Sequence, residues 1–146
     1  MTLKEIYNLA NGDHILYAGT KKELKRIMVG IEIGPAEMVM AKILKNIDAV
    51  IAYHVLNPER TTDAAKLLDL PLIRIKTPID NLAREFIKKA KEKQRIISEY
   101  YEVSKAENKD IAFISLGLNL LLDEVEKKGV AVVPCSSLIR VKRITH

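Results

Sequence analysis

Four short runs of the sequence are apolar at most positions, and segments with a helical pattern separate them. The clearest are "RIMVGIEI", "DAVIAY", "LIRIKT" and "VAVVPC", which are rich in Val and Ile. Successive side chains of a strand point to opposite sides of a sheet, so a strand with consecutive apolar residues is buried on both faces. The alternation with helices therefore predicts an α/β fold, a layered sheet that is largely parallel or mixed, with helices on both faces.

The boundaries of the expected elements come from capping and turn residues. Thr2 with Glu5 forms a capping-box pattern, Pro35 suits a first helical position, and Gly129 suits the residue after a helix. The expected helices are residues 2–10, 34–46, 58–70, 78–108 and 115–129. The expected strands are residues 14–19, 26–33, 48–53, 72–77, 110–114, 130–135 and 138–143.

Length and composition bound the organisation of the chain. The 146 residues suit one α/β domain that spans residues 1–146. No run is long enough for a membrane span and the first residues lack a signal-peptide core, so we expect a cytoplasmic protein that is not a membrane protein. The net charge is +5, but the Lys residues are spread along the chain, which argues against a nucleic-acid partner.

Polar residues next to the expected strands are the candidates for a site, because ligands of such sheets bind beyond the carboxyl ends of the strands. His54 follows residues 48–53, Asp80 follows residues 72–77, and Asp110 begins residues 110–114. One imidazole and two carboxylates can hold a divalent metal such as Zn, Mn or Fe. Structural roles also fit: His54 ends a strand in solvent, Asp80 caps a helix, and Asp110 lies in a surface turn.

The single cysteine, Cys135, cannot form a disulfide within the chain. It follows an expected strand in "PCSS" and could be a nucleophile or a plain structural residue. The sequence assigns no histidine to activate it, which favours the structural role.

Several stretches in order resemble the NGG-interacting-factor-three family, also known as dinuclear-metal-centre hexameric proteins and type-two GTP cyclohydrolase homologues. They include "RIMVGIEIGPAEMVMAKIL", "IDAVIAYH", "TTDAAKLLDLPLIRIKTPIDNLAREFI" and "SLGLNLLLDEVEKKGVAVVPCSSLIRVKR". The resemblance covers about three quarters of the chain, and the block that ends in "PCSSLIRVKR" is the most specific. It implies an α/β protein that forms a toroidal hexamer, with a two-metal site and metal-dependent hydrolysis of nucleotide-like substrates.

The chain departs from the family pattern where the metal ligands are. Where the family has His-His-Pro, this chain has Tyr53 before His54, and "HVLNPERTTDAA" also resembles a later family segment with a His before the Asp-Ala-Ala helix. His54 therefore matches the metal motif, the later segment, or a fusion of both. Asp80 in "TPIDN" matches a family ligand, whereas Asp110 stands where the family has a His. Glu32 is a conceivable further carboxylate or an exposed strand-end residue.

The resemblance implies a metal set of His54, Asp80 and Asp110, which can hold at most one metal. One function is a shortened metal-dependent hydrolase with a nucleotide-like ligand, and the alternative is a catalytically silent oligomeric scaffold or regulatory binding protein. A nucleic-acid-binding ring is a third reading. We also expect a homo-oligomer, with a contact through the apolar stripe of the 78–108 helix at Ile96, Ile97, Tyr100, Tyr101 and Val103.

Overall fold

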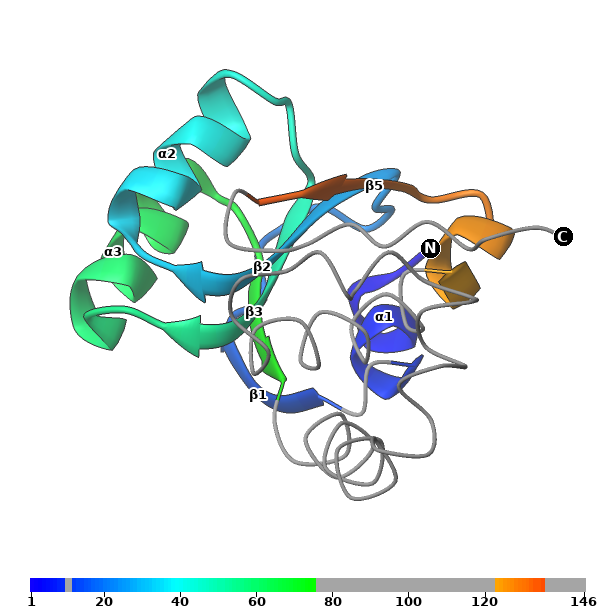
Figure 1. The fold of residues 1–146 in the computed structure, drawn as a ribbon, viewed down its shortest axis with the longest axis horizontal. Helices are drawn as coiled ribbons and strands as arrows, with labels where there is room; N and C mark the ends of the chain where they lie inside the picture. Colours follow the sequence, from blue (N-terminus) through cyan, green and yellow to red (C-terminus); the bar gives the residue numbers. More distant parts are fainter. Residues whose placement is uncertain (10–11, 76–122, 136–146) are drawn as a thin grey trace, which may run out of the picture.

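The computed structural model of the 146-residue chain describes residues 1–9, 12–75 and 123–135 (Figure 1). Helices and strands alternate along much of these ranges, as the sequence predicts. In chain order they are α1 (Leu3–Leu9), β1 (Gly12–Tyr17), β2 (Arg26–Ile33), α2 (Pro35–Ile43), β3 (Ala49–Val55), α3 (Pro58–Leu68), β4 (Leu72–Ile75) and β5 (Ala131–Pro134). Residues 123–127 are also helical.

The strands form one mixed sheet of five in the order β1-β4-β3-β2-β5. β2 pairs in parallel with β3 and with β5, and β3 pairs in parallel with β4. β1 pairs antiparallel with β4 and lies at one edge of the described sheet. The central strands β2 and β3 carry the longest run of buried residues, as expected for strands covered on both faces.

Helices cover both faces of the sheet, which confirms the predicted layers (Figure 1). On one face, Ile6 of α1 and Val125 of the 123–127 helix pack on alternate residues of the central strands, such as Val29 and Ile51. On the other face, Met38 of α2 and Ala65 of α3 belong to a second cluster with Met28, Val50, Ala52 and Leu72. Because successive side chains of a strand point to opposite faces of the sheet, the core is divided into two clusters, each covered by its own helices.

Local backbone geometry explains where the elements end. α1 begins as predicted, because the Thr2 hydroxyl accepts a hydrogen bond from the Glu5 N–H at 3.2 Å. α3 ends at Leu68, shorter than the predicted 58–70, because Asp69 has a left-handed φ of 47°. The strand predicted at 14–19 is observed two residues earlier, at Gly12–Tyr17, and Gly19 beyond it has a left-handed φ of 71°.

The strands expected at 48–53, 72–77 and 130–135 share one sheet, as predicted, and are observed as β3, β4 and β5. The strands expected at 110–114 and 138–143 and the helix at 78–108 lie outside the described residues, as does the apolar stripe at 96–103. Gly129 follows the 123–127 helix with a φ of 84°, as a glycine after a helix should. Among the helices in the described ranges, none has the length and hydropathy of a membrane span.

Asp48 joins the start of β3 to the start of β2. Its Oδ2 accepts hydrogen bonds from the backbone N–H groups of Lys25, at 2.8 Å, and Arg26, at 3.0 Å, and its Oδ1 pairs with the Lys21 ammonium. Partial burial raises the pKa of the Asp48 carboxyl, but these donors outweigh it and hold that pKa below its ordinary value. The ionised form of Asp48 therefore stabilises the fold.

We expect Asp48→Asn to lower the free energy of unfolding at pH 7 by about 2 kcal/mol, the scale of hydrogen bonds to a charged group. Because the folded pKa is lowered, this contribution is complete above the unfolded pKa of about 4 and is lost as the pH falls through the folded pKa. Melting temperatures from pH 7 down to pH 2 should show the gap to wild type closing in acid. The control is Asp13→Asn, since Asp13 pairs with Arg74 at 2.9 Å in a more exposed position and should change stability little.

Candidate functional site

The carboxyl ends of β2 and β3 bring Glu32 and His54 next to each other. These two residues are register partners in the parallel pair, and both are exposed. Partners in register on neighbouring strands project from the same side of a sheet. An imidazole and a carboxylate therefore share one side of the sheet at the edge where ligands of such folds bind.

His54 was predicted to follow a strand that ends at residue 53, and this boundary is wrong by two residues. β3 continues to Val55, which is paired with Ile33, and the N–H of Leu56 donates to the Ile33 carbonyl at 2.8 Å. β2 extends to Ile33, so His54 and Val55 can pair with its last two residues. His54 consequently sits on a rigid strand instead of at the start of a loop.

Tyr53 precedes His54 in β3, and its ring contacts both the core and the His54 imidazole. Its ring is half-buried and packs against the core cluster that contains Ile51 and Ile73. The ring also meets the His54 imidazole edge to face, with 4.4 Å between centroids. Tyr53 thus packs beside the imidazole, and its failure to replace a histidine ligand stays a prediction.

The other two predicted ligands, Asp80 and Asp110, lie outside the described residues, so their distance to His54 stays a prediction. Within residues 1–9, 12–75 and 123–135 there is no group of three or more His, Cys, Asp or Glu side chains placed to hold a metal. Glu32 and His54 are two donors of suitable chemistry, one oxygen and one nitrogen. Such a pair fits part of a one-metal site and is too small for two metals, each of which needs several ligands.

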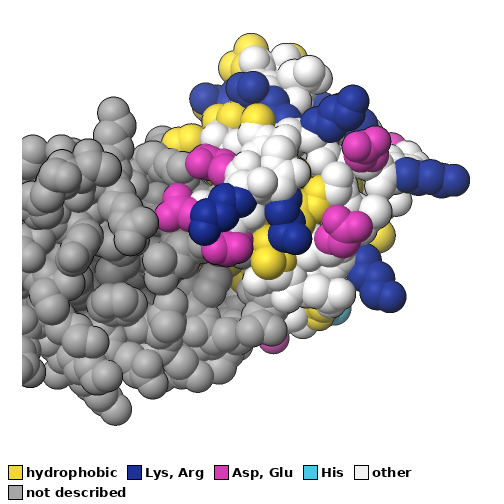
Figure 2. Space-filling view, turned by 90° about the vertical axis from the view of Figure 1, so that its right-hand side faces the viewer, with side chains coloured by type: hydrophobic (Ala, Val, Ile, Leu, Met, Phe, Trp, Pro, Cys, Tyr) yellow, Lys and Arg dark blue, Asp and Glu magenta, His cyan; other side chains and the backbone are white. Residues whose placement is uncertain are grey.

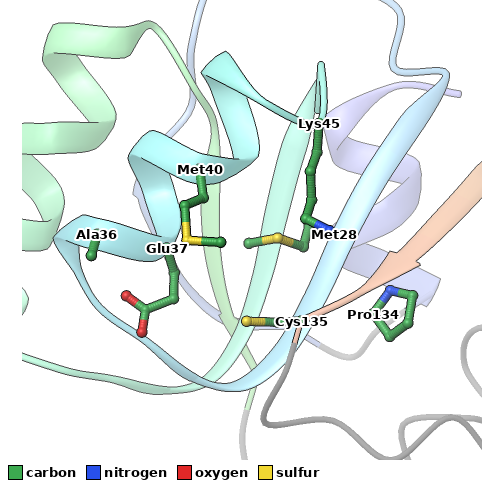
Figure 3. Close-up of a pocket in the computed structure, with 7 residues that line it drawn as sticks. All are labelled: Met28, Ala36, Glu37, Met40, Lys45, Pro134 and Cys135. Atoms are coloured by element: carbon green, nitrogen blue, oxygen red, sulfur yellow. The ribbon is translucent and has the colours of Figure 1, made fainter.

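Cys135 lines a hollow between α2 and the end of β5 (Figure 3). The hollow has a volume of about 180 Å³ and is lined by Met28, Ala36, Glu37, Met40, Lys45, Pro134 and Cys135. Cys135 is itself buried, and the described residues that line the hollow include no histidine. A nucleophile needs a neighbouring base, and the structural role expected for Cys135 stays a prediction.

Asp69 is a polar centre that sequence reasoning missed. Its carboxylate accepts hydrogen bonds from the Tyr17 hydroxyl at 2.7 Å, from the Thr20 N–H at 3.2 Å and from the Thr20 hydroxyl. The Thr20 hydroxyl, followed by that of Tyr17, lowers the pKa of Asp69, and the hydrogen bond to Asp69 raises the pKa of Tyr17. The network ties the loop after β1 to the turn before β4, and we assign it a structural role.

The charges on one face of the described part are mixed. In Figure 2, Lys and Arg side chains lie among Asp and Glu, with small apolar areas between them. Charges of both signs are thus interspersed on this face, and the expectation that the chain does not bind nucleic acid stays a prediction.

No protein-family model and no curated protein sequence matches the chain. Among solved structures, the chain is similar to the crystal structure of a NIF3 superfamily protein from Sphaerobacter thermophilus. The TM-score is 0.69 at 16% sequence identity, over 93% of this chain and 97% of the other. The sequence, and its resemblance to the NGG-interacting-factor-three family, predicted an α/β fold. The chain shares that fold with the NIF3 superfamily structure.

Proposed function

We propose that the chain is a member of the NIF3 superfamily and a metal-dependent hydrolase of nucleotide-like substrates that retains at most one metal. The observation that carries this proposal is the fold shared over almost the full length of both chains. The pair of Glu32 and His54 at the carboxyl ends of adjacent parallel strands supports it, because that edge is where such sheets bind ligands.

In this proposal His54 supplies the imidazole ligand, and Asp80 and Asp110 supply carboxylates, with Glu32 as a further carboxylate beside His54. A divalent metal held by these residues would supply Lewis-acid activation of water. A carboxylate that is not a ligand would serve as general base, and the exposed position of His54 and Glu32 would give a substrate access.

The limit of one metal follows from the number of donors. Two divalent ions about 4 Å apart need a large set of anionic and imidazole ligands to balance their charge. Tyr53 stands where the first histidine of the family motif would be, and a phenol with a pKa near 10 must lose a proton before it ligates. Its half-buried ring packs in the core, which adds to this argument.

Elemental analysis of protein purified without chelator tests the proposal. We expect about one divalent metal per chain, lost in His54→Ala and kept in His14→Ala, which replaces another exposed histidine of the same sheet. Two metals per chain, or a His54→Ala protein that keeps its metal, would contradict the assignment of the ligands.

An oligomeric scaffold or regulatory binding protein is the second candidate. It is favoured by the departures from the family's metal motif, where Tyr53 and Asp110 stand in place of histidines. If the purified protein holds no metal and added Mn or Zn neither binds nor raises its melting temperature, the scaffold becomes the better proposal.

A further inference from the structure

Sulfur atoms gather in the hollow between α2 and the end of β5. The chain has four Met and one Cys, and three of these five residues, Met28, Met40 and Cys135, line this one hollow. In Figure 3 the ends of the Met28 and Met40 side chains point toward each other, and the Cys135 sulfur points into the same space. Two thioethers and one thiol therefore face a single volume of about 180 Å³.

The sheet fixes two of the three sulfur-bearing residues on one face. Met28 in β2 is the register partner of Val133 in β5, and Cys135 follows two residues later, so both side chains project toward α2. The Cys135 N–H donates to the Val29 carbonyl at 2.8 Å, which keeps Cys135 against β2. A Cβ atom at Gly30 would be 2.8 Å from Cβ of Cys135, so the glycine is what permits this close approach. Met28 and Cys135 are thus held as a rigid pair.

Met40 brings the third sulfur from α2 and is the adjustable one. Its side chain is 46% exposed, whereas Met28 and Cys135 are 1% and 8% exposed. A methionine side chain is unbranched and has three rotatable bonds, so its sulfur can turn toward an ion while the helix stays in place. An ion can therefore enter beside Met40 and meet the two buried sulfur atoms.

The other residues that line the hollow indicate which kind of ion suits it. Ala36 and Pro134 are apolar, and Glu37 and Lys45 carry opposite charges. Sulfur is therefore the main donor element among the described lining residues. Thioether and thiolate ligands select soft ions such as Cu(I), whereas Mg, Ca and Mn prefer oxygen ligands. One thiolate also balances the charge of a monovalent ion, as a largely buried site requires.

We propose that Met28, Met40 and Cys135 form a binding site for the soft monovalent ion Cu(I), with two thioether ligands and one thiolate ligand. As the bond between copper and the Cys135 sulfur forms, the thiol proton passes to water, and neither copper nor sulfur changes its oxidation state. The site shares no residue with the proposed hydrolase site at Glu32 and His54, and it does not depend on that proposal.

Competition with a coloured chelator of Cu(I), in the absence of oxygen, measures the affinity of the full chain for the ion. We expect wild type to bind one Cu(I) per chain and Cys135→Ser to lose this binding. Met40→Leu removes the sulfur but keeps an apolar side chain of similar size, and it should weaken binding at least about tenfold, the smaller effect seen when a group that only orients a ligand is lost. Met38→Leu is the matched control, because Met38 is a buried residue of the same helix that does not line the hollow, and it should leave the affinity unchanged.

X-ray absorption at the copper edge identifies the ligands directly. We expect three sulfur neighbours in wild type and two in Met40→Leu, with thermal unfolding in the absence of metal showing that the variant is folded. His54→Ala should still bind Cu(I), and Met40→Leu should still hold the divalent metal of the proposed hydrolase, so failure of either proposal is seen separately. A wild-type protein that does not bind Cu(I), or that binds it no more tightly than Met40→Leu, overturns the proposal. Nitrogen or oxygen neighbours in place of the three sulfur atoms also overturn it.

Discussion

We expect Leu72→Ala to lower the free energy of unfolding by about 3–5 kcal/mol, the range found when a buried leucine is truncated in a rigid core. Leu72 is fully buried in β4, where it is register partner to Val50 on one side and to Tyr17 on the other. Strands on both sides restrain β4, so the surrounding residues cannot close the cavity. Thermal unfolding should show a melting temperature lower by about 6–20 °C, since each kcal/mol shifts it by about 2–4 °C in a domain of this size.

Leu67→Ala is the matched control, because it removes the same atoms from α3 at a position that is 88% exposed. We expect a change within about 0.5 kcal/mol, as for other surface substitutions. Equal losses for Leu67→Ala and Leu72→Ala would mean that β4 does not pack in the core as described.

The elements that could be predicted from the sequence are the strands in which consecutive residues are apolar, because that pattern shows burial on both faces. β2 was predicted at its observed bounds, because its Val and Ile residues identify a strand that is covered on both faces. The end of α3 could not be predicted as well, because it depends on the left-handed conformation of Asp69. The antiparallel pairing of β1 with β4 joins strands far apart in the sequence, so local sequence patterns could not predict it.

For the candidate site, His54 could be predicted from the sequence, but the position of Glu32 beside it could not. His54 stood out as a polar residue at the end of an apolar run, and it lies at that end of the sheet, although within the strand. Glu32 received less weight because the register that places it beside His54 links strands separated by a helix. Asp48 and Asp69 were missed because their donors lie more than twenty residues earlier in the chain, at a distance that no local motif covers.

Gly30 lies inside β2, at a point where the chain after β5 passes close to it. A Cβ atom at residue 30 would be 2.7 Å from Cδ1 of Ile33 and 2.8 Å from Cβ of Cys135. The tip of Ile33 can rotate away, but the N–H of Cys135 donates to the Val29 carbonyl at 2.8 Å, which holds the Cys135 Cβ near the strand. A glycine is therefore required here by the close approach of two chain segments.

We expect Gly30→Ala to destabilise the protein by about 1–3 kcal/mol, the cost of overpacking, even though replacing a strand glycine should by itself help by about 0.5–1 kcal/mol. A double-mutant cycle followed by denaturant unfolding separates these effects. In the Cys135→Gly background the obstructing Cβ is gone, so adding Gly30→Ala should cost little or nothing. In the Cys135→Ser background the Cβ remains, so adding Gly30→Ala should cost as much as in wild type. If Gly30→Ala is equally harmful in both backgrounds, the contact with Cys135 is not the reason for the glycine, and the close approach of the segment after β5 to β2 would need to be revised.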